Sequence, residues 1–168
     1  MPPTMITHLL VTSRYVVKGV VRTGGQRMQA ILGADGPNYL ILENAILWEL
    51  EGTKKVEVGN GLIRRDQVVF AHEYMDFASD PHRSQLEVDE ERQPVALQLL
   101  EPRGWELQGN LRAVELSSSR DDGVLVLLEP SLDAPPIIGA AREARDALNG
   151  LPYIIVNRSF VHGFLGHE

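Results

Sequence analysis

The sequence predicts a mainly β protein made of two tandem copies of one small β-barrel unit. Three observations lead to this prediction: an internal repeat, apolar runs of strand length inside each copy, and an acidic segment with few apolar residues between the copies. We place the first unit at residues 1–75, the linker at residues 76–94 and the second unit at residues 95–168.

The repeat consists of three blocks that follow one another in the same order in both copies. In the first block a Leu-Leu pair, an aromatic residue, a glycine and an arginine coincide without a gap, which aligns Gly19 with Gly109. The second block aligns Leu40 with Val126. The paired blocks are 8–22 with 98–112, 39–43 with 125–129, and 62–68 with 155–161. Three blocks in one order indicate a duplication.

Each block has the composition of β-strands. Short, turn-rich segments at 12–14 and 101–104 predict that the first two strands of each unit form a hairpin. Gly19 and Gly109 lie in the middle of the second strand, where a strand bends sharply or another backbone comes close. The expected strand runs are 16–21, 39–50, 107–111 and 124–132. Strands of this length and bend suit a small barrel.

Each unit is also expected to carry one short helix, at a different place in the two units. Residues 25–33 have apolar side chains at helical spacing and end in glycine, which favours a helix, while a strand over 26–33 stays open. Residues 140–148 are strong helix formers and are followed by an Asn-Gly pair, which predicts a helix near 139–149.

The charge distribution weighs against a general nucleic-acid binder. The formal net charge is −7, of which residues 1–75 contribute +1, residues 76–92 contribute −4 and residues 93–168 contribute −4. Negative charge in the middle and the second half repels phosphate backbones at long range. The near-neutral first half leaves room for a local basic patch.

Several classes of protein are disfavoured by composition. The absence of cysteine excludes disulfides, thiolate metal sites and thiol nucleophiles. No run of apolar residues has the length of a membrane helix, and residues 1–4 do not read as the start of a secretory signal. We therefore expect a cytoplasmic protein that does not enter membranes.

Two segments of the first unit resemble the motifs of the Sm-like superfamily of small, strongly bent five-stranded barrels. Residues 62–70 are similar to the second Sm motif, in which Ile-Arg-Gly-Asp/Asn precedes the last strand, and residues 40–45 are similar to the end of the first. The sequence departs from the motif at Arg65, where the family has glycine, and at Tyr39, where RNA-binding members have the asparagine that contacts uracil. The resemblance implies the barrel fold more than an activity.

A closer likeness is to uncharacterised bacterial proteins with Sm-like barrels. In those proteins an Arg-Leu-x-x-x-Leu helix lies between the second and third strands, and residues 27–32 are similar to it. The second unit keeps the apolar skeleton but has Val156-Asn157-Arg158-Ser159 at the second motif and lacks the aspartate. The chain thus resembles a tandem pair of such barrels.

The resemblance also suggests candidate ligand-binding residues. In RNA-binding Sm proteins the arginine that corresponds to Arg64 packs against a base, so Tyr39, Arg64 and Arg65 could form a stacking slot. The alternative is structural: Arg64 makes a hydrogen bond in the strand joint, and Tyr39 fills the barrel.

Catalytic, metal and cofactor sites are not expected. His162, His167 and Glu168 could supply metal ligands if the tail folded back, and His72-Glu73 is the equivalent ending of the first unit, but a solvated strand end and tail is the favoured interpretation. The segment Ser117–Asp122 has hydroxyl and carboxylate groups yet fits a polar loop, and Gly24-Gly25 fits a tight turn better than a phosphate cradle. We predict a protein that is not an enzyme.

The function expected from these features is a non-catalytic interaction or scaffold role. Small open barrels expose edge strands, and a common solution is to pair them edge to edge with a neighbour. Trp48 and Trp105 are expected to anchor a core or a subunit contact. The expected partner is a second copy of the chain or another protein, and the alternative is a single-stranded RNA or nucleotide bound through Tyr39, Arg64 and Arg65.

Overall fold

The computed structural model describes residues 7–22, 26–33, 36–50, 54–74, 91–112, 115, 123–133 and 140–166. These residues form ten strands, two helices and two 3₁₀ turns. The elements are β1 (Thr7–Thr12), β2 (Tyr15–Val21), α1 (Met28–Ile31), β3 (Tyr39–Glu49), β4 (Lys55–Arg64), η1 (Arg65–Gln67), β5 (Val68–Glu73), β6 (Arg92–Leu99), β7 (Glu106–Arg112), β8 (Val124–Asp133), α4 (Ala140–Leu148), β9 (Tyr153–Asn157), η3 (Arg158–Phe160) and β10 (Val161–Gly166).

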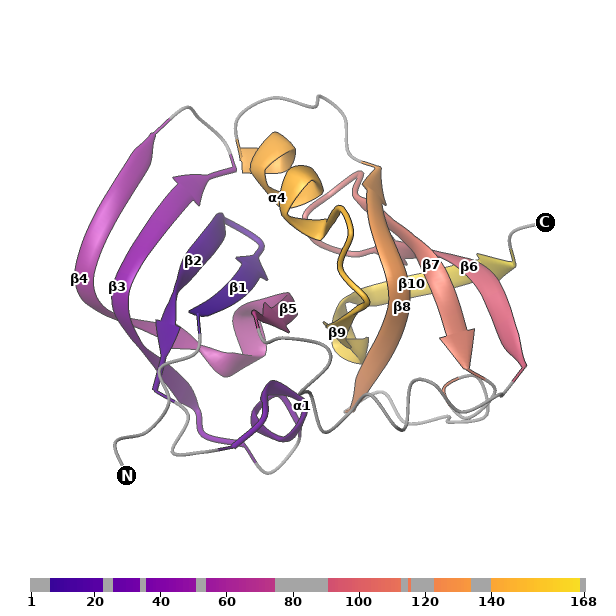
Figure 1. Cartoon of the computed structure of the whole chain (residues 1–168), viewed down its shortest axis with the longest axis horizontal. Helices are drawn as coiled ribbons and strands as arrows, with labels where there is room; N and C mark the ends of the chain where they lie inside the picture. The colour runs from indigo at the N-terminus through magenta and orange to yellow at the C-terminus, as the bar shows by residue number, and fades with distance from the viewer. Residues whose placement is uncertain are drawn as a thin grey trace.

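The ten described strands belong to one antiparallel sheet, which confirms the mainly β class. Its order is β10-β6-β7-β8-β9-β5-β1-β2-β3-β4, so the sheet is open, with β10 and β4 at its two edges. The halves meet where β5 pairs with β9, with Phe70 opposite Val156 and Ala71 opposite Ile155. Figure 1 shows β1–β5 on one side of this joint and β6–β10 on the other. We call the pairing of β5 with β9 the internal joint.

The two halves have the same strand order. In each, the fifth strand pairs with the first, followed by the second, third and fourth: β5-β1-β2-β3-β4 and β10-β6-β7-β8-β9. The register breaks opposite Gly19 in one half and opposite Gly109 in the other. The residues that bulge there, Asn44 and Glu129, both have φ of 51°. The two halves therefore share their strand order and the position of this register break.

Steric crowding explains why glycine occupies both of these positions. A Cβ atom on Gly19 would lie 2.7 Å from the Cβ of Ala45, and one on Gly109 would lie 2.6 Å from the carbonyl oxygen of Leu128. Such distances are too short for any side chain, so the bent strand comes this close only with glycine. The close approach predicted from sequence at both positions is confirmed.

The gapless alignment of residues 8–22 with 98–112 is wrong in its first strand. Val11 pairs with Val16, with four residues between them, whereas Gln98 pairs with Glu106, with seven between them. The second hairpin is therefore three residues longer, and Leu10 of β1 corresponds to Leu97 of β6 instead of Leu100.

The alignment of Leu40 with Val126 is wrong by one residue. Leu40 pairs with Ile63, and the residue that pairs with the matching Val156 is Leu125. A slip of one residue moves a side chain to the other face of the sheet. The apolar pattern could not set the register, because β8 is buried on both faces over Leu125–Leu128.

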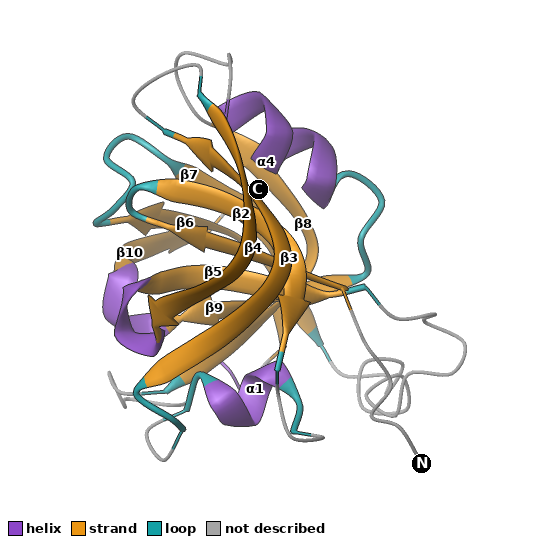
Figure 2. Cartoon of the chain, turned by 90° about the vertical axis from the view of Figure 1, so that its left-hand side faces the viewer, coloured by secondary structure: helices purple, strands orange, loops and turns teal. Residues whose placement is uncertain are grey.

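The helices form where the sequence predicts them. α1 lies within residues 25–33, so the segment that could have been helix or strand forms a helix. This helix buries Met28 and Ile31. α4 ends at Leu148, and Gly150 follows with φ of 81°. Figure 2 shows α4 at the top of the sheet and α1 at the bottom.

Residues 76–90 of the expected linker lie outside the described residues, and β6 already begins at Arg92, before the expected end of the linker at residue 94. No helix in the described part of the chain is long and apolar enough to cross a membrane.

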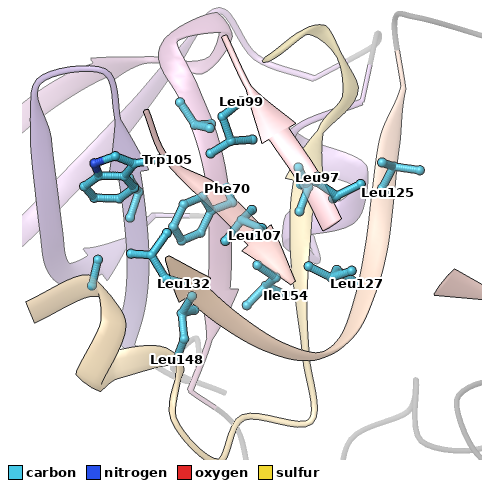
Figure 3. Packing of buried hydrophobic residues seen from close by; sticks show 14 of the residues in the cluster. Phe70, Leu97, Leu99, Trp105, Leu107, Leu125, Leu127, Leu132, Leu148 and Ile154 are labelled. Carbon is cyan, nitrogen blue, oxygen red and sulfur yellow. The ribbon is translucent and has the colours of Figure 1, made fainter. Parts of the chain in front are cut away.

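Two apolar clusters fill the two faces of the sheet, and both draw on both halves. The first surrounds Phe70 of β5 with side chains of the second half, among them Trp105 and Ile154, as Figure 3 shows. α4 contributes Ala144 and Leu148 to it. The second cluster joins the interior of the first half to residues of β8 and β9. The halves are thus held together by shared cores as well as by strand pairing.

Candidate functional site

An exposed surface lies on β3 and β4, at one edge of the sheet. Side chains alternate between the two faces of a strand, so Leu40 and Leu42 point inward and are buried. Tyr39 and Ile41 point to the other face, with relative exposures of 55% and 39%.

The opposite strand completes this surface. Arg64 pairs with Tyr39, and Leu62, which is 67% exposed, pairs with Ile41. Residues directly opposite in an antiparallel pair share a face. We call Tyr39, Ile41, Leu62 and Arg64 the β3–β4 face.

The structure brings Tyr39 and Arg64 together, as the stacking slot requires, but Arg65 has another role. The Arg65 Nη1 donates a hydrogen bond to the carbonyl oxygen of Gly33, which holds the turn after α1. Arg64 is exposed and forms an ion pair with Asp66 at 2.9 Å. The structural alternative is wrong for Tyr39, which is exposed, but Arg64 does donate a hydrogen bond in the joint between β4 and β5, to Asp66.

The same positions in the second half are covered. Matching pairings place Val126 and Ile155 where the first half has Ile41 and Leu62. Val126 and Ile155 are only 4% and 3% exposed, because they pack in the second cluster against the interior of the first half. The β3–β4 face is therefore the uncovered counterpart of a surface that is buried within the same chain.

A side-chain hydrogen bond reinforces the internal joint at the position that matches Arg64. This residue is Asn157, whose Nδ2 donates to the carbonyl oxygen of Val68 in β5 at 3.1 Å. Its Oδ1 accepts from the backbone N–H of Ser159. Asn157 thus ties the turn after β9 to the neighbouring half.

A buried ionic network also lies at the internal joint, and sequence reasoning did not find it. Glu73, 5% exposed, accepts hydrogen bonds from Arg27 Nε and from the backbone N–H of Met28. Arg27 Nη2 donates to the Tyr153 hydroxyl in β9 at 2.9 Å. The pairing places Gly166 where the first half has Glu73. The network therefore belongs to the internal joint, and Gly166 supplies no carboxylate at the matching position of β10.

Two buried histidines lie near this network. The His8 Nδ1 accepts a hydrogen bond from the backbone N–H of Val21 at 3.4 Å, and His72 meets the rings of Tyr74 and Tyr153 edge to face. Burial, and to a lesser extent the charge of Glu143, raises the pKa of Tyr74.

The residues considered for metal binding and catalysis are not brought into one site. His162 is exposed on β10. Glu73, which the sequence suggested as a ligand next to His72, forms an ion pair with Arg27. No group of three or more His, Asp or Glu side chains that could hold a metal ion occurs among the described residues. His167, Ser117–Asp122 and Gly24-Gly25 lie outside them.

A cleft of about 660 Å³ lies between the β1–β2 and β6–β7 turns. Its charged side chains are of both signs: Arg14, Arg103, Glu49 and Glu101. Trp105 borders the cleft but belongs to the core, and Trp48 is half-buried against the same core beneath Lys18 and Lys55. Both tryptophans act as packing anchors.

The chain matches no protein-family model, no curated protein and no solved structure at a significant level.

Proposed function

We propose that this chain is a non-catalytic interaction or scaffold protein built from two tandem Sm-like small-barrel units, and that it binds another polypeptide through the β3–β4 face and the adjoining edge of β4. The polypeptide is a second copy of the chain or another protein. The observation that carries the proposal is the exposed pair Ile41–Leu62, which occupies the position of the buried pair Val126–Ile155.

The proposal of two equivalent units is supported by pairing geometry. Both halves have one strand order, and both break register at a glycine of the second strand and again between the first and fifth strands. Both carry a 3₁₀ turn between the fourth and fifth strands. Independent irregularities at matching positions favour duplication of one unit over coincidence.

The interaction role is supported by the state of the two sheet edges. Among the described residues β4 pairs only with β3, and β10 pairs only with β6. An edge strand presents unpaired N–H and C=O groups that accept a further strand. At β4 these groups adjoin exposed apolar side chains, which is the combination that protein interfaces use.

A mass measurement over a range of concentrations, with purified protein and with candidate protein partners, tests this function. Leu62→Asp should abolish association, because a carboxylate cannot be buried at the apolar contact. Val56→Asp is the matched control: Val56 is an exposed apolar residue of the same strand, opposite Leu47, which packs in the core. Association that survives Leu62→Asp would contradict the proposed surface.

A second candidate function is the binding of single-stranded RNA. The observation in its favour is that Tyr39 and Arg64 are exposed cross-strand neighbours, so that an aromatic ring and a guanidinium lie on one face. Tyr39→Ala should then remove about 1–3 kcal/mol of stacking per base, and affinity should fall steeply with added salt.

Titration with a short uridine-rich RNA separates the two functions. The scaffold function predicts no salt-sensitive binding at micromolar protein, in keeping with a net charge of −7. A sub-micromolar dissociation constant that is lost in Arg64→Ala would favour RNA instead.

A further inference from the structure

We propose that the cleft between the β1–β2 and β6–β7 turns binds a small zwitterionic ligand, which is a free amino acid or a short peptide with an apolar side chain. This inference goes beyond the proposed interaction function and concerns another part of the molecule. The β3–β4 face lies at the Tyr39 end of β3, whereas Glu49 and Leu50, which line the cleft, lie at the opposite end. The two sites can therefore be tested separately.

The cleft has the size of a ligand site and is built from both halves of the chain. Its volume of about 660 Å³ lies within the range of roughly 300–1,000 Å³ that is typical of small-molecule sites. The first half lines it with residues 13–15, 49 and 50, and the second half lines it with residues 101–103 and 105. A ligand held there contacts both halves at once.

Hydrogen bonds hold the walls of the cleft in place. In the first turn the Thr12 hydroxyl accepts from the backbone N–H of Arg14 at 3.2 Å. The Arg14 carbonyl accepts from the backbone N–H of Leu50 at 2.8 Å, which joins this turn to the end of β3. In the second turn the backbone N–H of Trp105 donates to the Pro102 carbonyl at 3.1 Å. A preformed site loses little conformational freedom when a ligand binds.

The charges of the cleft select a ligand that carries both signs. Four charged side chains line it: Arg14, Glu49, Glu101 and Arg103. Within the part of the chain that the structure describes, none of these four side chains forms an ion pair or a hydrogen bond. A simple anion would meet two carboxylates of its own sign, and a simple cation would meet two guanidinium groups. A ligand with an ammonium and a carboxylate group finds partners for both.

Burial and position assign a role to each charged group. Glu49 is half-buried, whereas Arg14, Glu101 and Arg103 are exposed. Because Coulomb attraction is stronger where water is partly excluded, Glu49 is the group that binds the ammonium. Arg14 and Arg103 come from the turns of different halves and bind the carboxylate, for which the planar guanidinium is well suited.

The cleft also offers apolar surface to a side chain of the ligand. Leu50, Pro102 and Trp105 line it beside the charged groups. Trp105 belongs to the first apolar cluster and Leu50 packs against it, so both are fixed in position. An apolar side chain that covers this surface removes it from water. Leucine should therefore bind more tightly than glycine.

Isothermal titration calorimetry with the whole chain tests the proposal. L-Leucine or the dipeptide Leu-Leu, titrated to about 10 mM, should give saturable binding. The tighter of the two shows whether the site takes a free amino acid or a peptide. The N-acetyl derivative of that ligand lacks the ammonium, and its amide lacks the carboxylate. Each derivative should bind about tenfold more weakly or not at all, since it loses a charge-assisted hydrogen bond.

Substitutions place the ligand in the cleft. Glu49→Gln should bind the ligand and its N-acetyl derivative with equal affinity, because the carboxylate that recognises the ammonium is gone. The double variant Arg14→Gln/Arg103→Gln should likewise bind the ligand and its amide equally. Glu57→Gln on β4 and Arg142→Gln on α4 remove exposed charges outside the cleft and should keep both preferences. Thermal unfolding checks that each variant is folded.

The opposite results overturn the inference at distinct points. Absence of saturable binding for both leucine and Leu-Leu overturns the site. Equal affinity of the unsubstituted chain for the ligand and its two derivatives overturns the zwitterionic chemistry. Preferences that survive in Glu49→Gln and in the double arginine variant place the ligand outside the cleft. None of these results bears on the interaction function, which the concentration series with Leu62→Asp tests.

Discussion

The pairs Ile41–Leu62 and Val126–Ile155 occupy the same position in the two halves of the sheet, yet the first is exposed and the second is buried. Local sequence does not explain the difference, since all four residues are aliphatic. What differs is the second neighbour of the strand: β9 pairs with β5 as well as with β8 and lies against the interior of the first half, whereas among the described elements β4 pairs with β3 alone.

The comparison teaches that exposure at the β3–β4 face follows from its position at the edge of the sheet. Full burial of a large aliphatic side chain is worth about 1.5–3 kcal/mol. Val126 and Ile155 gain nearly all of this stabilisation within the chain, whereas Ile41 and Leu62, which are 39% and 67% exposed, gain only part of it.

The largest expected effect on folding stability comes from placing a charge at the buried pair Val126–Ile155. Ile155→Asp should destabilise the fold by about 4 kcal/mol or more, because the carboxylate has no partner in the second cluster. Leu62→Asp, at the matching exposed position, should change the stability of the dilute monomer by no more than about 0.5 kcal/mol. Urea unfolding measures the free energy of unfolding of both variants. Equal losses of stability would mean that the two pairs have the same environment.

A smaller loss is expected from the ionic network of the internal joint. Glu73→Gln should cost about 2–3 kcal/mol, near the lower limit for breaking a buried pair, since Arg27 keeps some contact with water. The exposed pair near the β4 edge is the matched control: Asp66→Asn should cost no more than about 1 kcal/mol. Chemical denaturation at neutral pH measures the stability of both variants. A larger loss for Asp66→Asn than for Glu73→Gln would contradict the assignment of Glu73 to the buried ion pair and of Asp66 to the exposed one.

The two glycines at the strand bends should respond alike. Gly19→Ala and Gly109→Ala should each destabilise by about 1–3 kcal/mol, because the added methyl group collides with Ala45 or with the Leu128 carbonyl. Gly59→Ala is the control, since its Cβ meets nothing within 4 Å, and it should be neutral or slightly stabilising. If only one of the two bends were sensitive, the halves would not be equivalent.

The smallest expected effect is a loss of folding stability at alkaline pH, caused by Tyr74 at the end of β5. The pKa of Tyr74 is raised by burial and then by Glu143, so the folded chain binds this proton more tightly than the unfolded chain. Stability should therefore fall as pH rises above about 10, where the unfolded tyrosine begins to ionise. Thermal unfolding between neutral pH and pH 11 should show a shallower fall for Tyr74→Phe, and an identical fall in both proteins would assign the dependence to other groups.

Features with a local cause could be predicted from the sequence. The helix at Ala140–Leu148 follows from its helix formers and the Asn-Gly stop, and the close approaches at Gly19 and Gly109 follow from glycine inside a strand. The third aligned block also has the predicted register, since Ile63 and Val156 occupy matching positions.

Features set by turn length or by the neighbouring half could not be predicted. The first block failed because the second hairpin is longer, and the second block failed because β8 is apolar on both faces. The pairing of Arg27 with Glu73 joins residues 46 positions apart that no periodicity connects. Tyr39 and Arg64 were placed together by the resemblance of their motifs, but the apolar pair beside them is recognisable only once the sheet order is known.

Hydrogen exchange of the β4 amides tests most directly whether the β3–β4 face is the uncovered counterpart of the internal joint. The outward-pointing amides of β4 should exchange fast in dilute protein and become protected as concentration rises, while the amides of β9 should be protected throughout. Leu62→Asp should abolish the concentration dependence and leave β9 unchanged. Protection of the outward-pointing β4 amides in dilute protein that equals the protection of β9 would contradict the account.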